Sequence, residues 1–361
     1  MIPLVSTRQN NFNALRMAMA ILVIWSHCFA LYLGTEENEP IALLTKGALD
    51  SGKIAVDVFF MISGFLILKS FDRSTSAWSY LGKRIARIYP GYLAAIGICA
   101  FVMLPLVGDV SYSIGTAFET LWRNLLLQGW FIESRAFEHN RGAHIVNGSL
   151  WSISYEFWCY LGILALGLLS GMRVRRAIVL AAFALIIVLD VWTQYTGKIW
   201  GGGLLGRVLG WPNIWFRMAP CFLLGMLVYL YQDRIPRSWG IACAAVFVLV
   251  VGVRLSPEAV SFLVPLCLGY LVFYAAFGRP IFDPARYGDY SYGTYLYAWP
   301  IQQLLIAYGS LSFPLFVCAA IVLSVLAGAG SWYAVERWFL RSKRVSMLAK
   351  QTDFPAHPRS G

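Results

Sequence analysis

The chain alternates between long apolar stretches and short polar segments, and this pattern determines the fold that we expect. About 20 apolar residues are enough for a helix to cross a bilayer, and ten stretches approach that length. The spans are expected at 12-33, 48-68, 88-108, 149-170, 177-194, 213-231, 239-254, 258-276, 291-309 and 313-335. The sequence therefore predicts an all-α polytopic membrane protein with about ten transmembrane helices in one bundle.

Composition and charge support this prediction and set an orientation. Hydrophobic residues make up 59% of the 361 and charged residues 13%, with a mean hydropathy of +0.64, well above a globular average. With both termini in the cytoplasm, 20 of the 29 Lys and Arg residues lie inside, as the positive-inside rule requires. The net charge of +11 is then orientation charge beside membrane lipids and needs no nucleic-acid partner.

No linker, repeat or low-complexity block divides the chain. We expect one integral-membrane domain over 1-345 and a short cytoplasmic tail over 346-361. The polar start before the first span is not typical of a removed signal peptide, so that span should stay. The outer loop 109-148 is unusually long, which suggests a function or disorder, and a short helix is expected around Ala117-Leu127.

Three ionisable residues lie within the first two apolar stretches, where such groups are costly and mark functional sites. Arg16 and His27 are eleven residues apart, so they share one helix face with about 16 Å between them. Asp57 in the next span should lie at a similar depth to His27. A carboxylate beside an imidazole suits a general base, and a structural ion pair between the two spans is an equal alternative.

Arg84 and Arg87 lie on one helical face in a basic segment near the cytoplasmic side, the side of Arg16. Guanidinium groups bind phosphates bidentately, so a phosphate-rich ligand could dock there. Composition alone favours a topology signal with lipid headgroup contacts.

The fourth span opens with a polar stripe in which Ser149, Ser152 and Glu156 recur at i, i+3 and i+7, next to Trp151. Sugar binding or proton relay would use these residues, whereas interhelical hydrogen bonding explains the serines equally well. Tyr295 belongs to the aromatic opening of the ninth span and can be an ordinary interfacial residue. The cysteines and the remaining histidines lack metal-type spacing, so we expect no metal.

Five ordered motifs together resemble the acyltransferase 3 family of bacterial integral-membrane acyltransferases, most of all its stand-alone exopolysaccharide O-acetyltransferases. One departure is Ala298, where many members have His, so we assign no chemistry to that position. The motifs are Arg16-x10-His27, Val56-Asp57-x-Phe59-Phe60-x-Ile62-Ser63-Gly64-Phe65, Arg84-x-x-Arg87-x-x-Pro90-x-Tyr92, Leu150-Trp151-Ser152-x-x-x-Glu156 and Ser291-Tyr292-Gly293-x-Tyr295-Leu296.

The resemblance implies an acyl-CoA-dependent O-acyltransferase in the bacterial inner (cytoplasmic) membrane. The acyl group, usually acetyl from cytoplasmic acetyl-CoA, would pass to a hydroxyl of a cell-surface or secreted polysaccharide or its lipid-linked precursor. His27 would be the catalytic base with Asp57 as its partner, and Glu156 would serve the acceptor. The donor would contact Arg16, Arg84 and Arg87, with acetyl-CoA as co-substrate and no permanent cofactor.

Two other functions stay open. A glycolipid or solute transporter or flippase would use the same intramembrane His, Asp and Arg as a pathway, and a scaffold in polysaccharide-synthesis machinery would need only the packing motifs. The sequence does not identify the acceptor, the acyl group (acetyl, succinyl or another) or a homo-oligomeric state. It also leaves open whether His27 deprotonates the acceptor directly or is acylated first.

Overall fold

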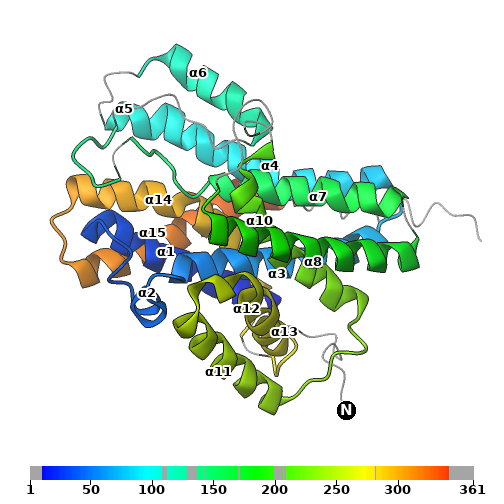
Figure 1. The fold of residues 1–361 in the computed structure, drawn as a ribbon. Coiled ribbons are helices and arrows are strands. Elements are labelled where there is room, and N and C mark those ends of the chain that lie inside the picture. The colour runs from blue at the N-terminus through cyan, green and yellow to red at the C-terminus, as the bar shows by residue number, and fades with distance from the viewer. Residues whose placement is uncertain are drawn as a thin grey trace, which may run out of the picture.

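The computed structural model describes residues 10–107, 112–127, 136–142, 144–169, 171–198, 206, 209–280 and 282–340, so the expected tail 346-361 lies outside the described residues. Of the residues that the structure describes, 79% are helical and none lies in a strand. Each of the ten predicted spans coincides with a helix (Figure 1). These are α1 (Phe12–Cys28), α3 (Ser51–Asp72), α4 (Ala77–Ile98), α7 (Trp151–Leu169), α8 (Met172–Thr196), α10 (Pro212–Leu230), α11 (Trp239–Leu255), α12 with α13 (Val260–Leu263, Gly269–Ala276), α14 (Ser291–Tyr308) and α15 (Phe313–Ser331).

Seven continuous helical stretches within the described ranges are long and apolar enough to cross a membrane. Several run on through short π-helical turns, as α1 does over Phe29–Leu33. The all-α membrane architecture is confirmed, while the count of ten spans and the cytoplasmic termini stay predictions.

The third predicted span begins too late in the sequence-based assignment. Helix α4 starts at Ala77 rather than near position 88, and Ser76 caps it by accepting a hydrogen bond from the Ser79 amide. Hydropathy finds only the apolar part of a helix, and the first turns of α4 carry the basic residues. The two arginines predicted to share a helical face therefore lie on a helix.

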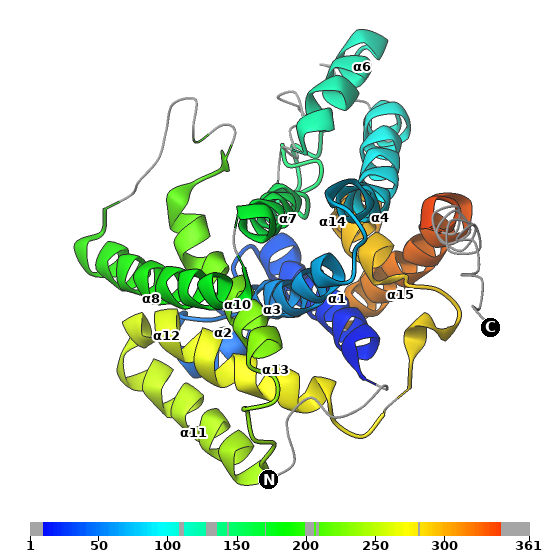
Figure 2. The same ribbon diagram turned by 90° about the vertical axis from the view of Figure 1, so that its right-hand side faces the viewer.

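Helix α3 is the centre of the bundle. In Figure 2, α1 and α3 lie between α8 and α10 on one side and α14 and α15 on the other. Helices α3 and α10 cross at two glycines: a Cβ on Gly64 would lie 2.0 Å from the Phe222 carbonyl oxygen, and one on Gly225 equally near that of Met61. Small residues permit this close approach, as is typical of membrane helices.

Two short helices lie outside the bundle core. Helix α2 (Pro40–Thr45) is capped by the buried Glu39 carboxylate, and α6 (Ile114–Arg123) falls close to the short helix expected in the long loop. The end of that loop docks on α14: Asn140 and Asn147 donate to the backbone oxygens of Gln303 and Leu296, both at 2.9 Å. These contacts order the segment that borders the site described next.

Candidate active site

The three arginines predicted to bind a phosphate-rich ligand line one cavity of about 310 Å³. Arg16 comes from α1, and Arg84 and Arg87 come from α4. Lys83 adds a fourth positive charge, and Glu156 of α7 is the one acidic residue in the lining. The cavity therefore has an excess of positive charge at the end of the bundle where α3 ends and α4 begins. We call it the arginine cavity.

Asp289, just before α14, holds two of these arginines in place. Its Oδ2 accepts hydrogen bonds from Arg16 Nη1 at 2.9 Å and Arg87 Nη2 at 2.7 Å, and its Oδ1 accepts one from the Ser291 hydroxyl. Burial by itself raises the pKa of Asp289, but Arg16, Arg87 and the Ser291 hydrogen bonds outweigh it and hold that pKa below its usual value. The carboxylate is charged at any physiological pH.

Arg84 is left much freer than the other two arginines. Its Nη2 lies 3.3 Å from the Ser70 hydroxyl, and its guanidinium carbon lies 5.7 Å from the centre of the Tyr160 ring. Its Nε is buried without a hydrogen-bond partner among the described residues. No acidic group neutralises Arg84 within ion-pair distance in the described part of the chain, so it is the arginine best able to bind an added phosphate.

A narrow cavity of about 50 Å³ adjoins the arginine cavity and shares Arg16, Ser63 and Glu156 with it. Glu156 accepts hydrogen bonds of 2.6 Å from Ser63 and from Tyr160. The resemblance assigns Glu156 to the acceptor, and in the structure it lies in the wall that the arginine cavity and the narrow cavity share.

Ser152 and Tyr295 line the far part of the narrow cavity. Their hydroxyls lie 2.8 Å apart, and the Tyr295 hydroxyl also donates to the backbone oxygen of Ser149. The Ser149 hydroxyl itself is buried with no partner among the described residues. Trp151 is half-exposed, packs on Tyr155, and lines neither cavity.

His27 packs against Trp299, which lies one helical turn after Tyr295 on α14. The centres of the His27 and Trp299 rings are 4.9 Å apart. Trp299 is fixed from the other side by the docked loop, since its indole donates to the Ile145 oxygen at 3.0 Å and a Cβ on Gly148 would lie 2.8 Å from its ring. The imidazole Nδ1 is buried and has no hydrogen-bond partner in the described structure. This nitrogen is unused in the resting protein.

The expected pairing of His27 with Asp57 is not observed. Both Asp57 oxygens accept hydrogen bonds from Arg217 of α10, at 3.2 and 3.1 Å. The two residues lie at different depths in the bundle. Gly52, at the start of α3, is in contact with Ser26, since a Cβ on Gly52 would meet the Ser26 side chain, and so His27 lies level with the start of α3. Asp57 lies several residues further along that helix. The carboxylate at the start of α3, beside Ser26 and therefore nearer in depth to His27, is Asp50.

The sequence analysis thus assigned no role to four residues of the site: Asp50, Arg217, Asp289 and Trp299. An arginine inside an apolar helix was a usable signal for Arg217. Asp289 and Asp50 flank helices and carry no comparable signal. The described residues contain no group of three His, Cys, Asp or Glu side chains able to hold a metal ion.

Comparison with known proteins identifies the family of the chain. The acyltransferase 3 family model, described as an acyltransferase domain, matches residues 9–333. An O-acetyl transferase of Shigella phage Sf6 is 26% identical over 92% of this chain and 96% of that protein. Nodulation protein 10 of Rhizobium leguminosarum bv. viciae is 26% identical over 96% of this chain and 97% of its own.

A third relative is similar over a shorter region. The acyltransferase MdmB of Streptomyces mycarofaciens is 30% identical over 43% of this chain and 38% of its own length. No solved structure matches the chain. The chain belongs to the acyltransferase 3 family and is a multi-pass membrane acyltransferase.

Proposed function

We propose that the protein moves an acyl group, acetyl in the first instance, from acyl-CoA on the cytoplasmic side to a hydroxyl of a cell-surface or secreted polysaccharide or its lipid-linked precursor. The membrane would be the bacterial inner membrane. The observation that carries this proposal is the arginine cavity, in which Arg16, Arg84 and Arg87 converge from two helices. Coenzyme A carries several phosphates, and charge-assisted fork contacts are the strongest that a protein offers them.

The donor's thioester would reach inward from that cavity. The narrow cavity continues from Glu156 to Ser152 and Tyr295, and His27 lies one turn further out beside Trp299. Arg16 and His27 are eleven residues apart on α1, about 16 Å along the axis, a distance that an extended pantetheine arm can cover. The phosphates and the thioester would thus occupy opposite ends of this route.

His27 would act as the general base. It takes the proton from the acceptor hydroxyl, the hydroxyl oxygen attacks the thioester carbonyl carbon, and the carbon–sulfur bond breaks. The imidazolium then returns the proton to the leaving thiolate. Asp50, which caps α3 beside the neighbouring Ser26, would be the carboxylate nearest in depth to this base, while Asp57 would act at a distance, by fixing Arg217.

The relative named as an O-acetyl transferase supports acetyl as the group and oxygen as the acceptor atom. Glu156 would position Ser63 and Tyr160 around the donor rather than touch the acceptor. Ser152 and Tyr295, joined by their hydroxyls, would line the thioester's path.

Mass spectrometry of envelope and secreted glycans tests the proposal in cells that lack the protein, carry the wild type, or carry His27→Ala at equal expression. His139→Ala, a change at an exposed loop histidine, is the matched control. We expect an acyl mass increment only with the wild type and His139→Ala. Equal acylation in all four strains would refute the proposal, and an accompanying change in glycan export would favour the transporter.

A further inference from the structure

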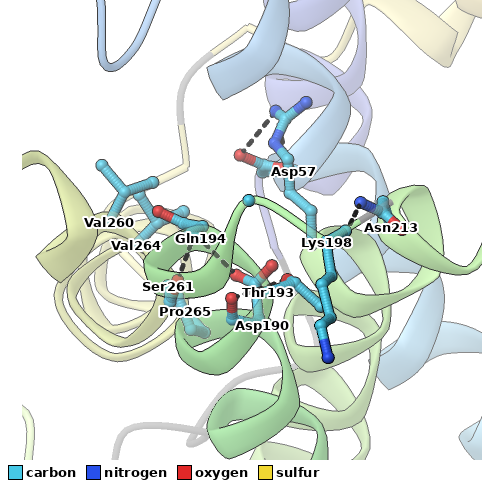
Figure 3. A pocket seen from close by; sticks show the side chains of 12 residues that line it. Asp57, Asp190, Thr193, Gln194, Lys198, Asn213, Val260, Ser261, Val264 and Pro265 are labelled. Carbon is cyan, nitrogen blue, oxygen red and sulfur yellow. Dashed lines mark hydrogen bonds and ion pairs between the residues drawn. The ribbon is translucent and has the colours of Figure 1, made fainter. Parts of the chain in front are cut away.

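A second cavity, of about 390 Å³, lies at the opposite end of the bundle, where α3 begins and α8 ends. Its described lining residues come from α3, α8, α10, α12 and the π-helical turn Val264–Leu268. Figure 3 shows Asp57, Asp190 and Gln194 directed into one space together with Ser261. Its volume is within the roughly 300–1,000 Å³ range of small-molecule sites. We call it the outer cavity, since the predicted orientation places it outside.

The lining of the outer cavity is polar and electrically balanced. Asp57 and Asp190 carry negative charge, and Arg217 and Lys198 carry positive charge. Because positive and negative side chains are equal in number, the outer cavity lacks the excess positive charge that suits the arginine cavity to a phosphate-rich ligand. Val260, Val264 and Pro265 form an apolar wall on one side, so polar groups and an apolar surface face the same space.

Asp190 gives this cavity an acceptor that is only partly used. It is buried in α8, and its side-chain partners are Gln194, whose Nε2 is 3.2 Å from Oδ2, and the Ser261 hydroxyl. No Lys, Arg or His nitrogen from the described ranges lies within 4 Å of it. A carboxylate has about four lone-pair sites, so part of its hydrogen-bonding capacity is left for a ligand. A charged group so deep among helices is expected to serve a function.

The outer cavity lies close to the proposed base along α3. The start of α3 contacts α1 beside His27, since a Cβ on Gly52 would lie 2.9 Å from the Ser26 Oγ, and Asp57 is five residues further along α3, about 7.5 Å along the axis. Asp57, which lines the outer cavity, and Ser63, which lines the narrow one, are six residues apart on α3, about 9 Å along the axis. A ligand in the outer cavity would therefore approach His27 from the side opposite the donor.

We propose that the outer cavity binds a neutral, hydroxyl-rich ring of the acceptor glycan, with Asp190 accepting hydrogen bonds from its hydroxyls and Arg217, Gln194 and Ser261 contacting further oxygens. The proposal rests on the proposed function, because it assigns the acceptor a place in the same reaction. Sugar rings present hydroxyls at their edges and C–H groups on their faces, and the cavity offers polar groups and an apolar wall to match.

The test uses the full-length protein in lipid vesicles with radiolabelled acetyl-CoA. The acceptor probe is the oligosaccharide fraction released by mild acid from glycans of cells that lack the protein, after removal of O-acyl groups by mild base. We expect Asp190→Asn to raise the KM for this fraction roughly 10- to 100-fold, as loss of a charged hydrogen bond does, with the KM for acetyl-CoA unchanged. Asp233→Asn, the same change at an exposed residue after α10, should alter neither.

A second variant keeps the proposal testable if Asp190→Asn does not fold. Ser261→Cys should react with a charged methanethiosulfonate, and the oligosaccharide fraction should slow that reaction. An unchanged oligosaccharide KM in Asp190→Asn, or no protection of Ser261→Cys, would overturn this inference while transfer by the wild type stood. A wild type that transfers no acetyl group would instead overturn the proposed function itself.

Discussion

Arg84 offers the sharpest test of the donor site, because its removal should cost donor affinity and little else. Its contacts in the protein are a 3.3 Å hydrogen bond to Ser70 and the face of Tyr160, so Arg84→Ala breaks no ion pair. A hydrogen bond to a charged group contributes about 1.5–3 kcal/mol. The KM for acetyl-CoA should therefore rise about 10- to 150-fold, with kcat changed far less.

The assay follows acetyl transfer by the protein in vesicles at varied acetyl-CoA concentration. Arg84→Lys should fall between wild type and Arg84→Ala, since lysine keeps the charge and loses the fork geometry. Arg173→Ala removes an exposed positive charge from the same end of the bundle and is the matched control. Equal KM increases for Arg84→Ala and Arg173→Ala would refute the reasoning, because they would indicate general attraction to a basic surface.

Two further changes test the framework of the site. Asp289→Asn leaves Arg16 and Arg87 without their shared partner and should lower the free energy of unfolding at pH 7 by about 1–3 kcal/mol, since all three side chains are only partly buried. Because its partners lower the pKa of Asp289, this contribution is complete above the ordinary value of about 3.9 and is lost as pH falls below it. Thermal unfolding of wild type and variant should therefore converge only under strong acid, and convergence near pH 6 would contradict the assignment. Gly225→Ala places a Cβ 2.0 Å from the Met61 oxygen and should lower the free energy of unfolding by about 1–3 kcal/mol or more. Gly162→Ala, with nothing within 4 Å of the added Cβ, is the control and should unfold like wild type. Equal unfolding temperatures for the two variants would contradict the described α3–α10 crossing.

The helices were predictable because the length of each apolar stretch gives the approximate length of the helix that it forms. The first span, expected at 12-33, agrees with the helical stretch Phe12–Leu33. The predicted boundary was wrong where a helix extends beyond its apolar part. This is the case at the start of α4, whose first turns carry charge. The convergence of three arginines on one surface was also predictable, because it follows from helix periodicity and from one shared membrane side.

The sequence alone did not predict which side chains of different helices pair. The partner of Asp57 is Arg217, 160 positions away, and nothing in either segment encodes the other. The position of each residue along its helix determines which side chains can pair. Asp57 and His27 differ by a few residues in depth, so they do not meet. Asp289 was overlooked for a related reason: its importance comes from Arg16 and Arg87, which reach it from two other elements.

The central claim is that His27 carries acyl transfer from the donor to a glycan hydroxyl. The most direct measurement reconstitutes wild type, His27→Ala and His139→Ala in vesicles and follows both the free CoA thiol and the acetylated oligosaccharide. We predict that wild type and His139→Ala form the two products in equal amounts, and that His27→Ala, with unfolding like that of wild type, forms neither. Undiminished acetylated oligosaccharide with His27→Ala would contradict the account.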